Sequence, residues 1–397
     1  MKFFLLLLLP LYINAASLDS LIKNARSSHI SLWAIQHRLD AVNNEYETTK
    51  NFANPELSIT VSDIQFNDLN NRSIEPMQFT AVNFKQKIPY FGKRDANGKK
   101  VKAKIDKLNI TIEDAIVKLL KEIKLTAYTI WQTQEHLRIT DEYITLTKQN
   151  IELYTAYSVN DTSAHMGIMS TELSLSQLKI KKSKLKSVLE ALYKRISYLS
   201  AMDVTEVSMD MEIKAPKNLD CYLKNLLSNK TYKIKEASVE VANADLHIKE
   251  LADRVDTTLQ VGYYKREKFD DYMNIGISFS LPIYGTEESN KEASRRILLA
   301  TQNEAADYKY YISSKISEIY AELKESYEAY KIINEESLPQ IEHMADLSSA
   351  SVKNGAELFI YTQMLEKKLV LDEQSINSVA SYKKSLASIE ALTGESR

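Results

Sequence analysis

The sequence contains two related segments, Phe79-Thr-Ala-Val-Asn-Phe-Lys-Gln-Lys-Ile-Pro-Tyr-Phe-Gly92 and Tyr272-Met-Asn-Ile-Gly-Ile-Ser-Phe-Ser-Leu-Pro-Ile-Tyr-Gly285. Pro89 aligns with Pro282 and Gly92 with Gly285, and the two segments lie about half a chain apart. Each follows another alternating apolar and polar run and precedes a long stretch that is poor in proline. A repeat of this kind predicts a duplicated chain with two similar halves.

The alternation in these segments predicts β-strands. Met273, Ile275, Ile277 and Phe279 alternate with polar or small residues, which is the two-residue period of a strand with one apolar face. The predicted strands cover residues 57–64, 79–88, 258–264 and 272–281.

Apolar residues at helical spacing predict long helices between the strands. Ile105, Leu108, Ile112, Ala115 and Leu119 step by three and four residues, as in a coiled-coil seam. The predicted helices cover residues 18–51, 96–159, the stretch from the turn at 160–163 to 202, 219–253, 288–352 and the stretch from the turn at 353–355 to 392. The second would be roughly 95 Å long at 1.5 Å per residue. Pro339 is expected to kink the fifth.

The N-terminus predicts an export signal. Lys2 is followed by an apolar run from Phe3 to Ile13 and by a cleavage site after Ala15, and the run is too short to cross a membrane as a helix. The expected division is 1–15 signal peptide, 16–208 first repeat, 209–218 linker and 219–397 second repeat.

Composition narrows the class of protein. With 8 Gly and 7 Pro in 397 residues, turns are scarce and long elements must dominate. Lys and Arg number 51 against 53 Asp and Glu, so no basic field favours nucleic acid as a partner. The single cysteine, Cys221, excludes an intramolecular disulfide and is expected to be a small buried side chain.

Strands and helices of these lengths do not fit one soluble globule. A soluble sheet with one face on a helical core explains the alternation alone, but the export signal and the long helices favour an outer-membrane β-barrel. Aromatic residues near the strand ends suit the girdles of such a barrel; they are Phe79, Tyr90, Phe91, Tyr263, Tyr264, Tyr272 and Tyr284. Lipid tolerates no open sheet edge, and the smallest barrels have about eight strands. Copies of the chain must therefore share one barrel, continued by helices as a conduit.

The chain resembles the TolC-type outer-membrane efflux proteins over essentially its whole mature length. The resemblance rests on the duplication, on the helix–two strands–two long helices order of each half, and on the elements Ile88-Pro-x-x-Gly92 and Leu281-Pro-x-x-Gly285. Residues 86–94 are similar to the heavy-metal efflux branch. The resemblance implies an α+β membrane fold, in which a homotrimer shares a twelve-stranded β-barrel that coiled-coil helices continue as a periplasmic α-barrel.

The resemblance also implies a function and a location. The chain would be the passive exit duct of a tripartite efflux pump, in the outer membrane of a Gram-negative bacterium with a periplasmic extension. Its partners would be outer-membrane lipid, a periplasmic adaptor (membrane fusion) protein and a proton-driven inner-membrane transporter, and metal ions are one candidate cargo. Two alternatives stay open: the duct of a type I protein secretion system, and a soluble periplasmic coiled-coil structural protein.

The resemblance places functional residues at three kinds of position. The helix-turn tips that contact the adaptor correspond to Tyr157, Asn160, Asn354, Gly355 and Leu358, and turn chemistry alone is the alternative explanation for each of them. The expected pore constriction consists of Glu357, Tyr361 and Met364, with Tyr361 and Met364 where some relatives carry acidic residues. The strand-to-helix corners are Pro89, Gly92, Pro282 and Gly285.

No motif predicts catalysis. The sequence has no nucleotide-binding glycine loop, no G-x-S-x-G and no H-E-x-x-H, and its six histidines form no pair at helical spacing. His165, Met166 and Met169 could offer soft metal ligands, although helix packing explains them more simply. We therefore expect no enzyme activity, no cofactor and no bound metal.

Overall fold

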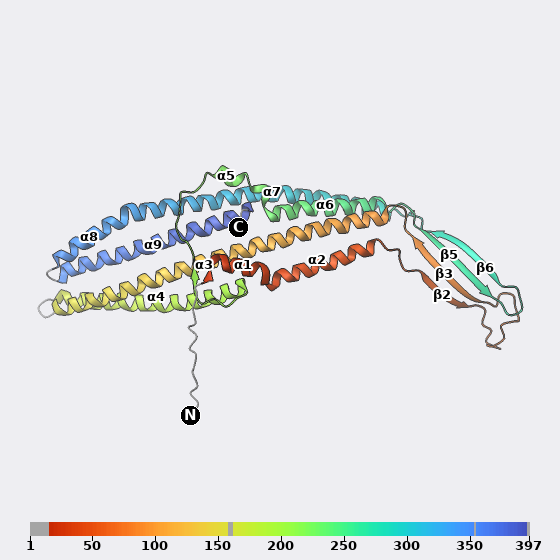
Figure 1. Cartoon of the computed structure of the whole chain (residues 1–397), viewed down its shortest axis with the longest axis horizontal. Helices are drawn as coiled ribbons and strands as arrows, with labels where there is room; N and C mark the ends of the chain where they lie inside the picture. The colour runs from red at the N-terminus through yellow and green to blue at the C-terminus, as the bar shows by residue number, and fades with distance from the viewer. Residues whose placement is uncertain (1–15, 158–161, 353–354, 395–397) are drawn as a thin grey trace, which may run out of the picture. The chain divides into compact units, whose positions relative to one another are not determined.

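The computed structural model describes residues 16–157, 162–352 and 355–394. In chain order the elements, labelled in Figure 1, are β1 (Ala16–Ser17), α1 (Leu18–Ser28), α2 (Ile30–Thr49), β2 (Glu56–Val61), β3 (Thr80–Ile88), α3 (Lys93–Tyr157), α4 (Thr162–Ser200), β4 (Val207–Ser208), α5 (Leu219–Leu223), the 3-10 turn η2 (Leu226–Ser228), α6 (Lys230–Glu250), β5 (Thr257–Lys265), β6 (Tyr272–Phe279), α7 (Thr286–Ile332), the π turn η3 (Ile333–Ser337), α8 (Leu338–Ser351) and α9 (Gly355–Thr393).

The chain divides into two compact units, and both predicted repeats contribute to each. The unit that we call the sheet unit consists of Ala34–Ile112 and Thr231–Lys309. The helical unit consists of the segment up to Trp33, Glu113–Lys230 and the segment from Tyr310. The long helices α3 and α7 contribute residues to both.

The sheet unit contains a four-stranded antiparallel sheet in the order β2-β3-β5-β6. The central pair, β3 and β5, joins the two halves of the chain, with Phe84 opposite Val261 and Val82 opposite Tyr263. All four strands connect to helices at one end of the sheet, which we call the helix end (Figure 1). At the other end, the loop end, residues 62–79 connect β2 to β3 and residues 266–271 connect β5 to β6.

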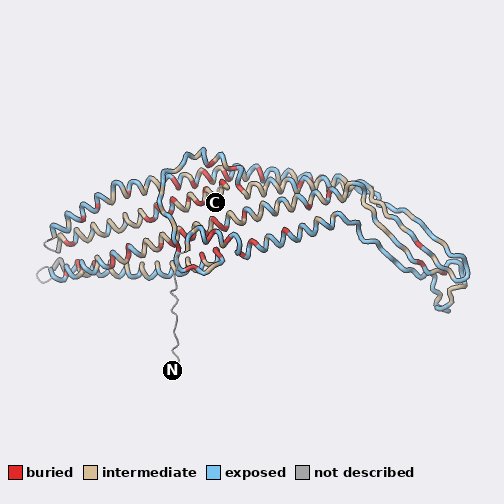
Figure 2. Tube along the Cα trace, viewed as in Figure 1, coloured by how far each residue is buried: buried red, intermediate tan, exposed pale blue. Residues whose placement is uncertain are grey.

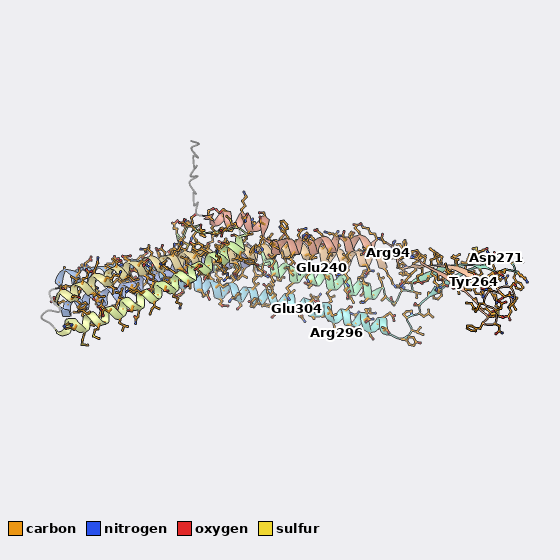
Figure 3. The ribbon with its side chains drawn as sticks, turned by 90° about the horizontal axis from the view of Figure 1, so that it is seen from below. Arg94, Glu240, Tyr264, Asp271, Arg296 and Glu304 are labelled. Carbon is orange, nitrogen blue, oxygen red and sulfur yellow. The ribbon has the colours of Figure 1, made fainter. Side chains whose placement is uncertain are left out.

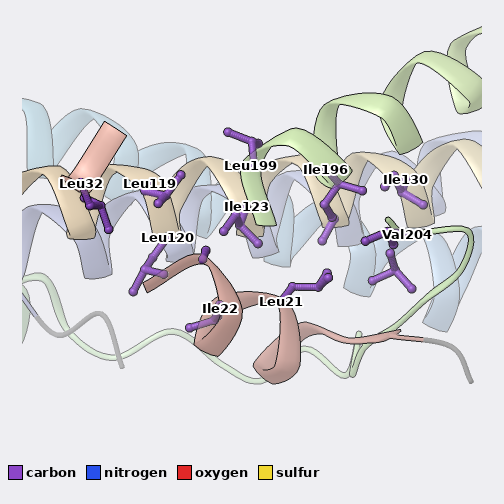
Figure 4. Packing of buried hydrophobic residues seen from close by; sticks show 13 residues of the cluster. Leu21, Ile22, Leu32, Leu119, Leu120, Ile123, Ile130, Ile196, Leu199 and Val204 are labelled. Atoms are coloured by element: carbon purple, nitrogen blue, oxygen red, sulfur yellow. The ribbon is translucent and has the colours of Figure 1, made fainter. Parts of the chain in front are cut away.

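The helical unit is built around a buried apolar cluster. Leu21 and Ile22 of α1 pack with Ile123 of α3 and Ile196 of α4 (Figure 4). A fully buried Leu or Ile side chain stabilises a fold by about 1.5–3 kcal/mol. In the same unit α7 buries Ile312, Ile316, Ile319 and Leu323, as their spacing predicts.

Three predicted helices are interrupted, two at local contacts and one at a contact with a distant part of the chain. His29 separates α1 from α2, because its extended backbone lets its Nδ1 accept the Ser31 N–H at 3.3 Å. Residues 219–253 form α5, η2 and α6, because the backbone of Asn229 leaves the helical region (φ −56°, ψ 126°) and its side-chain amide donates to the Leu392 carbonyl at 3.0 Å. Near Pro339 the helix widens into the π turn η3, where Leu338 N–H bonds to Ile333 O.

Cys221 and the turn at Asn160 differ in part from what the sequence predicts. Cys221 is exposed, so its prediction as a buried side chain was wrong: it lies on the short helix α5, which buries Tyr222 instead. The turn predicted to begin at Asn160 falls partly outside the described residues, and α4 begins at Thr162.

Candidate functional site

One face of the sheet is apolar from edge to edge. Cross-strand partners place the apolar residues of all four strands on the same side, because each directly opposed pair shares a face. Each of these apolar residues is between 38% and 75% exposed; they are Leu57, Ile59, Val61, Val82, Phe84, Leu259, Val261, Tyr263, Met273, Ile275, Ile277 and Phe279. Figure 2 shows these strands largely in the exposed colour. Nothing within the described chain covers this face.

The opposite face is polar. Ser58, Asn83, Gln260 and Ser278 lie on it, and the Gln260 side-chain amide donates to Ser278 Oγ at 3.2 Å. Tyr264 and Tyr272 also lie on this face, by the same alternation. Their assignment to a lipid-facing girdle was therefore wrong. Each tyrosine is next to an apolar-face residue in its strand, Tyr263 or Met273, and successive residues of a strand point to opposite faces.

The predicted corners lie between strand and helix at the helix end. Gly92 has φ +92° and Gly285 has φ +73°, values that favour glycine. A side chain at either position would meet no atom within 4 Å, so the backbone conformation is what requires glycine. Gly92 O accepts from Ala96 N at 2.9 Å and Gly285 O from Ser289 N at 3.1 Å, which starts α3 and α7. Pro89 and Pro282 lie just before, where a strand no longer needs an N–H donor.

The carboxylate of Asp256, which the sequence analysis did not identify, connects β5 to the strand-to-helix corner after β3. Asp256, the residue before β5, accepts from Tyr90 N at 2.8 Å and from Lys93 Nζ at 2.9 Å, and it pairs with Lys87 Nζ at 3.3 Å. Partial burial alone would raise the pKa of the Asp256 carboxyl, but the hydrogen bonds from Tyr90, Lys93 and Lys87 outweigh it and hold the pKa below its ordinary value. Asp256 thus joins the second half of the chain to the corner of the first.

We expect Asp256→Asn to destabilise the protein by about 1.5–3 kcal/mol at neutral pH, the range for hydrogen bonds to a charged group. Because the folded pKa lies below the ordinary 3.8, the carboxylate contributes above that pH and loses its contribution as the pH falls through the folded pKa. Denaturant unfolding at pH 7 and at pH 3 should show the gap between wild type and variant narrowing at pH 3. The exposed neighbour Asp253→Asn is the control. An equal gap at both pH values would contradict an ionic role.

The predicted tip residues lie in the helical unit. Tyr157 is the last residue of α3 and Gly355 the first of α9, whereas Asn160 and Asn354 lie outside the described residues. Leu358 is fully buried against Tyr154 of α3, with Ile168, Val352 and Tyr361 packed around them. The structure therefore brings α3, α4 and α9 together behind the tips. Adaptor contact by these residues stays a prediction.

The residues of the predicted constriction follow on α9. Glu357 is in its first turn, and Glu357, Tyr361 and Met364 are all half-buried. Burial raises the pKa of the Tyr361 phenol, with a smaller contribution from Asp346, so this side chain is neutral at physiological pH. Its ring packs on the Tyr154 and Leu358 cluster. A constriction at this level stays a prediction.

The described residues show no metal site and no membrane-crossing helix. In the described part of the chain, no three His, Cys, Asp or Glu residues lie where they could hold one metal ion. Met166 and Met169 are 78% and 71% exposed, so helix packing within this chain does not account for them. None of the described helices combines the length and apolar composition that a membrane-crossing helix needs.

Solved structures of known proteins share this architecture. VceC, an outer-membrane protein of Vibrio cholerae, superposes with a TM-score of 0.76 at 14% identity, over 95% of this chain and 96% of that one. CusC gives 0.72 at 12% identity over 97% and 95%, and the Campylobacter jejuni outer-membrane channel CmeC gives 0.71 at 13% over 95% and 85%. The chain has the TolC-type outer-membrane channel fold.

The predicted fold of the single chain, long helices combined with four β-strands, is therefore confirmed. No protein-family model and no curated protein sequence matches it. At 12–14% identity the TolC-type fold is carried by the arrangement of elements rather than by shared residues, which is why the strand register and the corners are informative.

Proposed function

We propose that this protein is the outer-membrane exit duct of a tripartite efflux pump, which passively conducts substrates delivered by an inner-membrane transporter and a periplasmic adaptor. The observation that carries the proposal is the apolar face of the sheet, which is exposed on all four strands. Apolar side chains left in water over such an area mark a contact with a membrane or a partner. In outer-membrane barrels, residues along each strand alternate between an apolar outer face in contact with lipid and a polar inner face that lines the lumen.

The sheet edges support assembly from several copies. β2 and β6 are the edge strands, and lipid does not tolerate their unpaired N–H and C=O groups. Because the sheet is antiparallel with four strands, β6 of one copy and β2 of the next run in opposite directions and can pair. Three copies of a four-stranded sheet give the twelve strands expected for a trimer.

The helices support the remainder of the proposal. α3 alone has 65 residues, far more than are needed to cover one small sheet. VceC is an outer-membrane protein, and OprN, CmeC and the Neisseria gonorrhoeae MtrE are outer-membrane channels. In the same arrangement, the helix end of this sheet faces the periplasm, and the tips of the helical unit meet the adaptor. A conduit needs no catalytic site, since the transporter supplies the energy.

The proposal is tested by membrane fractionation, by electrophoresis with and without heating, and by reconstitution in planar bilayers. We expect recovery with the outer membrane, a heat-sensitive trimer and discrete conductance steps. Recovery as a soluble monomer would overturn the proposal.

We expect Tyr361→Ala/Met364→Ala to raise single-channel conductance, because removing two half-buried side chains from one turn of α9 would widen the predicted constriction. Gln363→Ala, an exposed neighbour on the same helix, is the control and should conduct like the wild type. If the double variant also conducts like the wild type, these residues do not limit the pore.

A further inference from the structure

At the loop end of the sheet, the polar face carries a cluster of aromatic rings. Tyr264 and Tyr272 are cross-strand partners on β5 and β6, and their rings stack with centroids 4.6 Å apart and planes 6° apart. The Phe79 ring meets Tyr264 edge-on at 5.0 Å. Ala81, opposite Tyr264 on β3, is completely buried. Offset and edge-on pairs of this kind are the favoured aromatic arrangements, so the cluster has one well-defined geometry.

Gly262 allows Tyr264 to lie across the polar face. A Cβ at Gly262 would stand 2.8 Å from the Tyr264 ring and 2.4 Å from Asn83 Oδ1. The Tyr264 ring therefore occupies the space in which another residue at position 262 would place its side chain. Figure 3 labels Tyr264 together with Asp271 at this end of the sheet.

The connection between β5 and β6 is fixed to this cluster. The Arg266 guanidinium lies 5.0 Å from the Tyr272 ring, on which it makes a cation–π contact. Its Nε donates to the Asp270 carbonyl at 2.8 Å, and the Arg266 N–H donates to Asp271 Oδ1 at 2.8 Å. Tyr263 O–H donates to the other Asp271 oxygen. The connection is thus cross-linked to both of its strands.

The longer connection, residues 62–79, is also held internally. Gln78 is 1% exposed and donates to the carbonyls of Asp63 at 3.2 Å and Asn71 at 3.1 Å, while its Oε1 accepts from Ile74 N at 2.8 Å. Arg266 Nη1 reaches the Pro76 carbonyl at 3.5 Å, which links the two connections. Both loops at this end therefore have fixed positions relative to the rings.

We propose that Phe79, Tyr264, Tyr272 and Arg266, the aromatic collar, form a fixed constriction at the outer end of the lumen that restricts the duct to small solutes. This rests on the proposed function, which makes the polar face the lumen wall and the loop end the outer mouth. Eight-stranded barrels are filled by their own side chains, whereas those with 16 or more strands leave an aqueous channel. With twelve strands, three copies of the collar at one level decide how wide the exit is.

The test is single-channel conductance with uncharged polyethylene glycols of graded size added on the outer side. We expect Tyr264→Ala/Tyr272→Ala to raise conductance and to shift the size cut-off to larger polymers. Tyr264→Phe/Tyr272→Phe keeps the rings and should behave like the wild type. Tyr284→Ala removes a 90% exposed aromatic ring beyond the helix end of β6 and is the control for general effects of aromatic loss.

Constrictions in series add their resistances, so each variant is also measured in the Tyr361→Ala/Met364→Ala background. Unchanged conductance and cut-off in both backgrounds would overturn the collar. If the alanine pair fails to assemble, Asn274→Trp adds bulk beside Tyr272 on the same face and should lower the cut-off, and an unchanged cut-off there overturns the collar too. A wild-type protein that forms no channel would overturn the proposed function instead.

Discussion

Ile275→Arg is expected to remove the protein from the outer membrane. Ile275 lies in the middle of β6 on the apolar face, opposite Val261, and is 75% exposed. An arginine facing lipid near the bilayer midplane costs about 2–4 kcal/mol in an outer-membrane barrel. In a trimer each chain carries that cost, so the effect is threefold larger than for a single-chain barrel. Fractionation and heat-modifiable electrophoresis should show loss of the membrane-inserted trimer.

The neighbouring residue supplies a matched control. Asn274→Arg introduces the same side chain into the same strand, but on the polar face, opposite Gly262. Because that face would line a water-filled lumen, we expect insertion to be retained. If both arginine variants insert equally well, the apolar face does not meet lipid. If both fail equally, the strand simply does not tolerate arginine.

The elements of the sheet unit could be predicted because their signals are local. Alternation identifies the strands with ends that differ by at most three residues from the observed ones, and Gly92 and Gly285 identify corners whose positive φ angles only glycine adopts easily. The order β2-β3-β5-β6 could not be derived from these signals. Which strands are neighbours depends on contacts between residues far apart in the chain. The role of Asp256, which joins β5 to the corner after β3, stayed hidden for that reason.

The aromatic collar shows where a local signal was available and was missed. Tyr264 and Tyr272 stand at strand ends, and aromatic residues there suggested a membrane girdle. Residues two apart in a strand share a face, so Tyr272 lies on the same face of β6 as Asn274 and Ser278. In the same way, Tyr264 lies on the same face of β5 as Gln260. Counting positions from Ile275 would have put Tyr272 on the polar face. The contact with Arg266 could not be foreseen, because it depends on how the connection folds back.

Gly167→Ala is expected to destabilise the protein, although glycine in a helix is normally about 1 kcal/mol worse than alanine. Gly167 lies in α4, and a Cβ there would stand 2.3 Å from a ring carbon of Tyr154, a side chain only 1% exposed. The ring is enclosed by Leu358 and cannot move aside without opening the contact of α3 with α9. Overpacking of a filled core costs about 1–3 kcal/mol, which outweighs the gain in helix propensity.

Gly98→Ala in α3 is the matched control, because there the nearest atom to a new Cβ is Thr49 Oγ1 at 3.4 Å, an ordinary contact distance. It should be neutral or stabilise by up to about 1 kcal/mol. Denaturant unfolding gives both differences, and hydrogen exchange of residues 150–156 and 165–172 should show faster opening only in Gly167→Ala. Combining it with Tyr154→Ala should abolish the clash, so that Gly167→Ala becomes neutral or favourable in that background. If Gly167→Ala stabilises the wild type as much as Gly98→Ala does, α3 and α4 are not packed through Tyr154, and the tip is held together in another way.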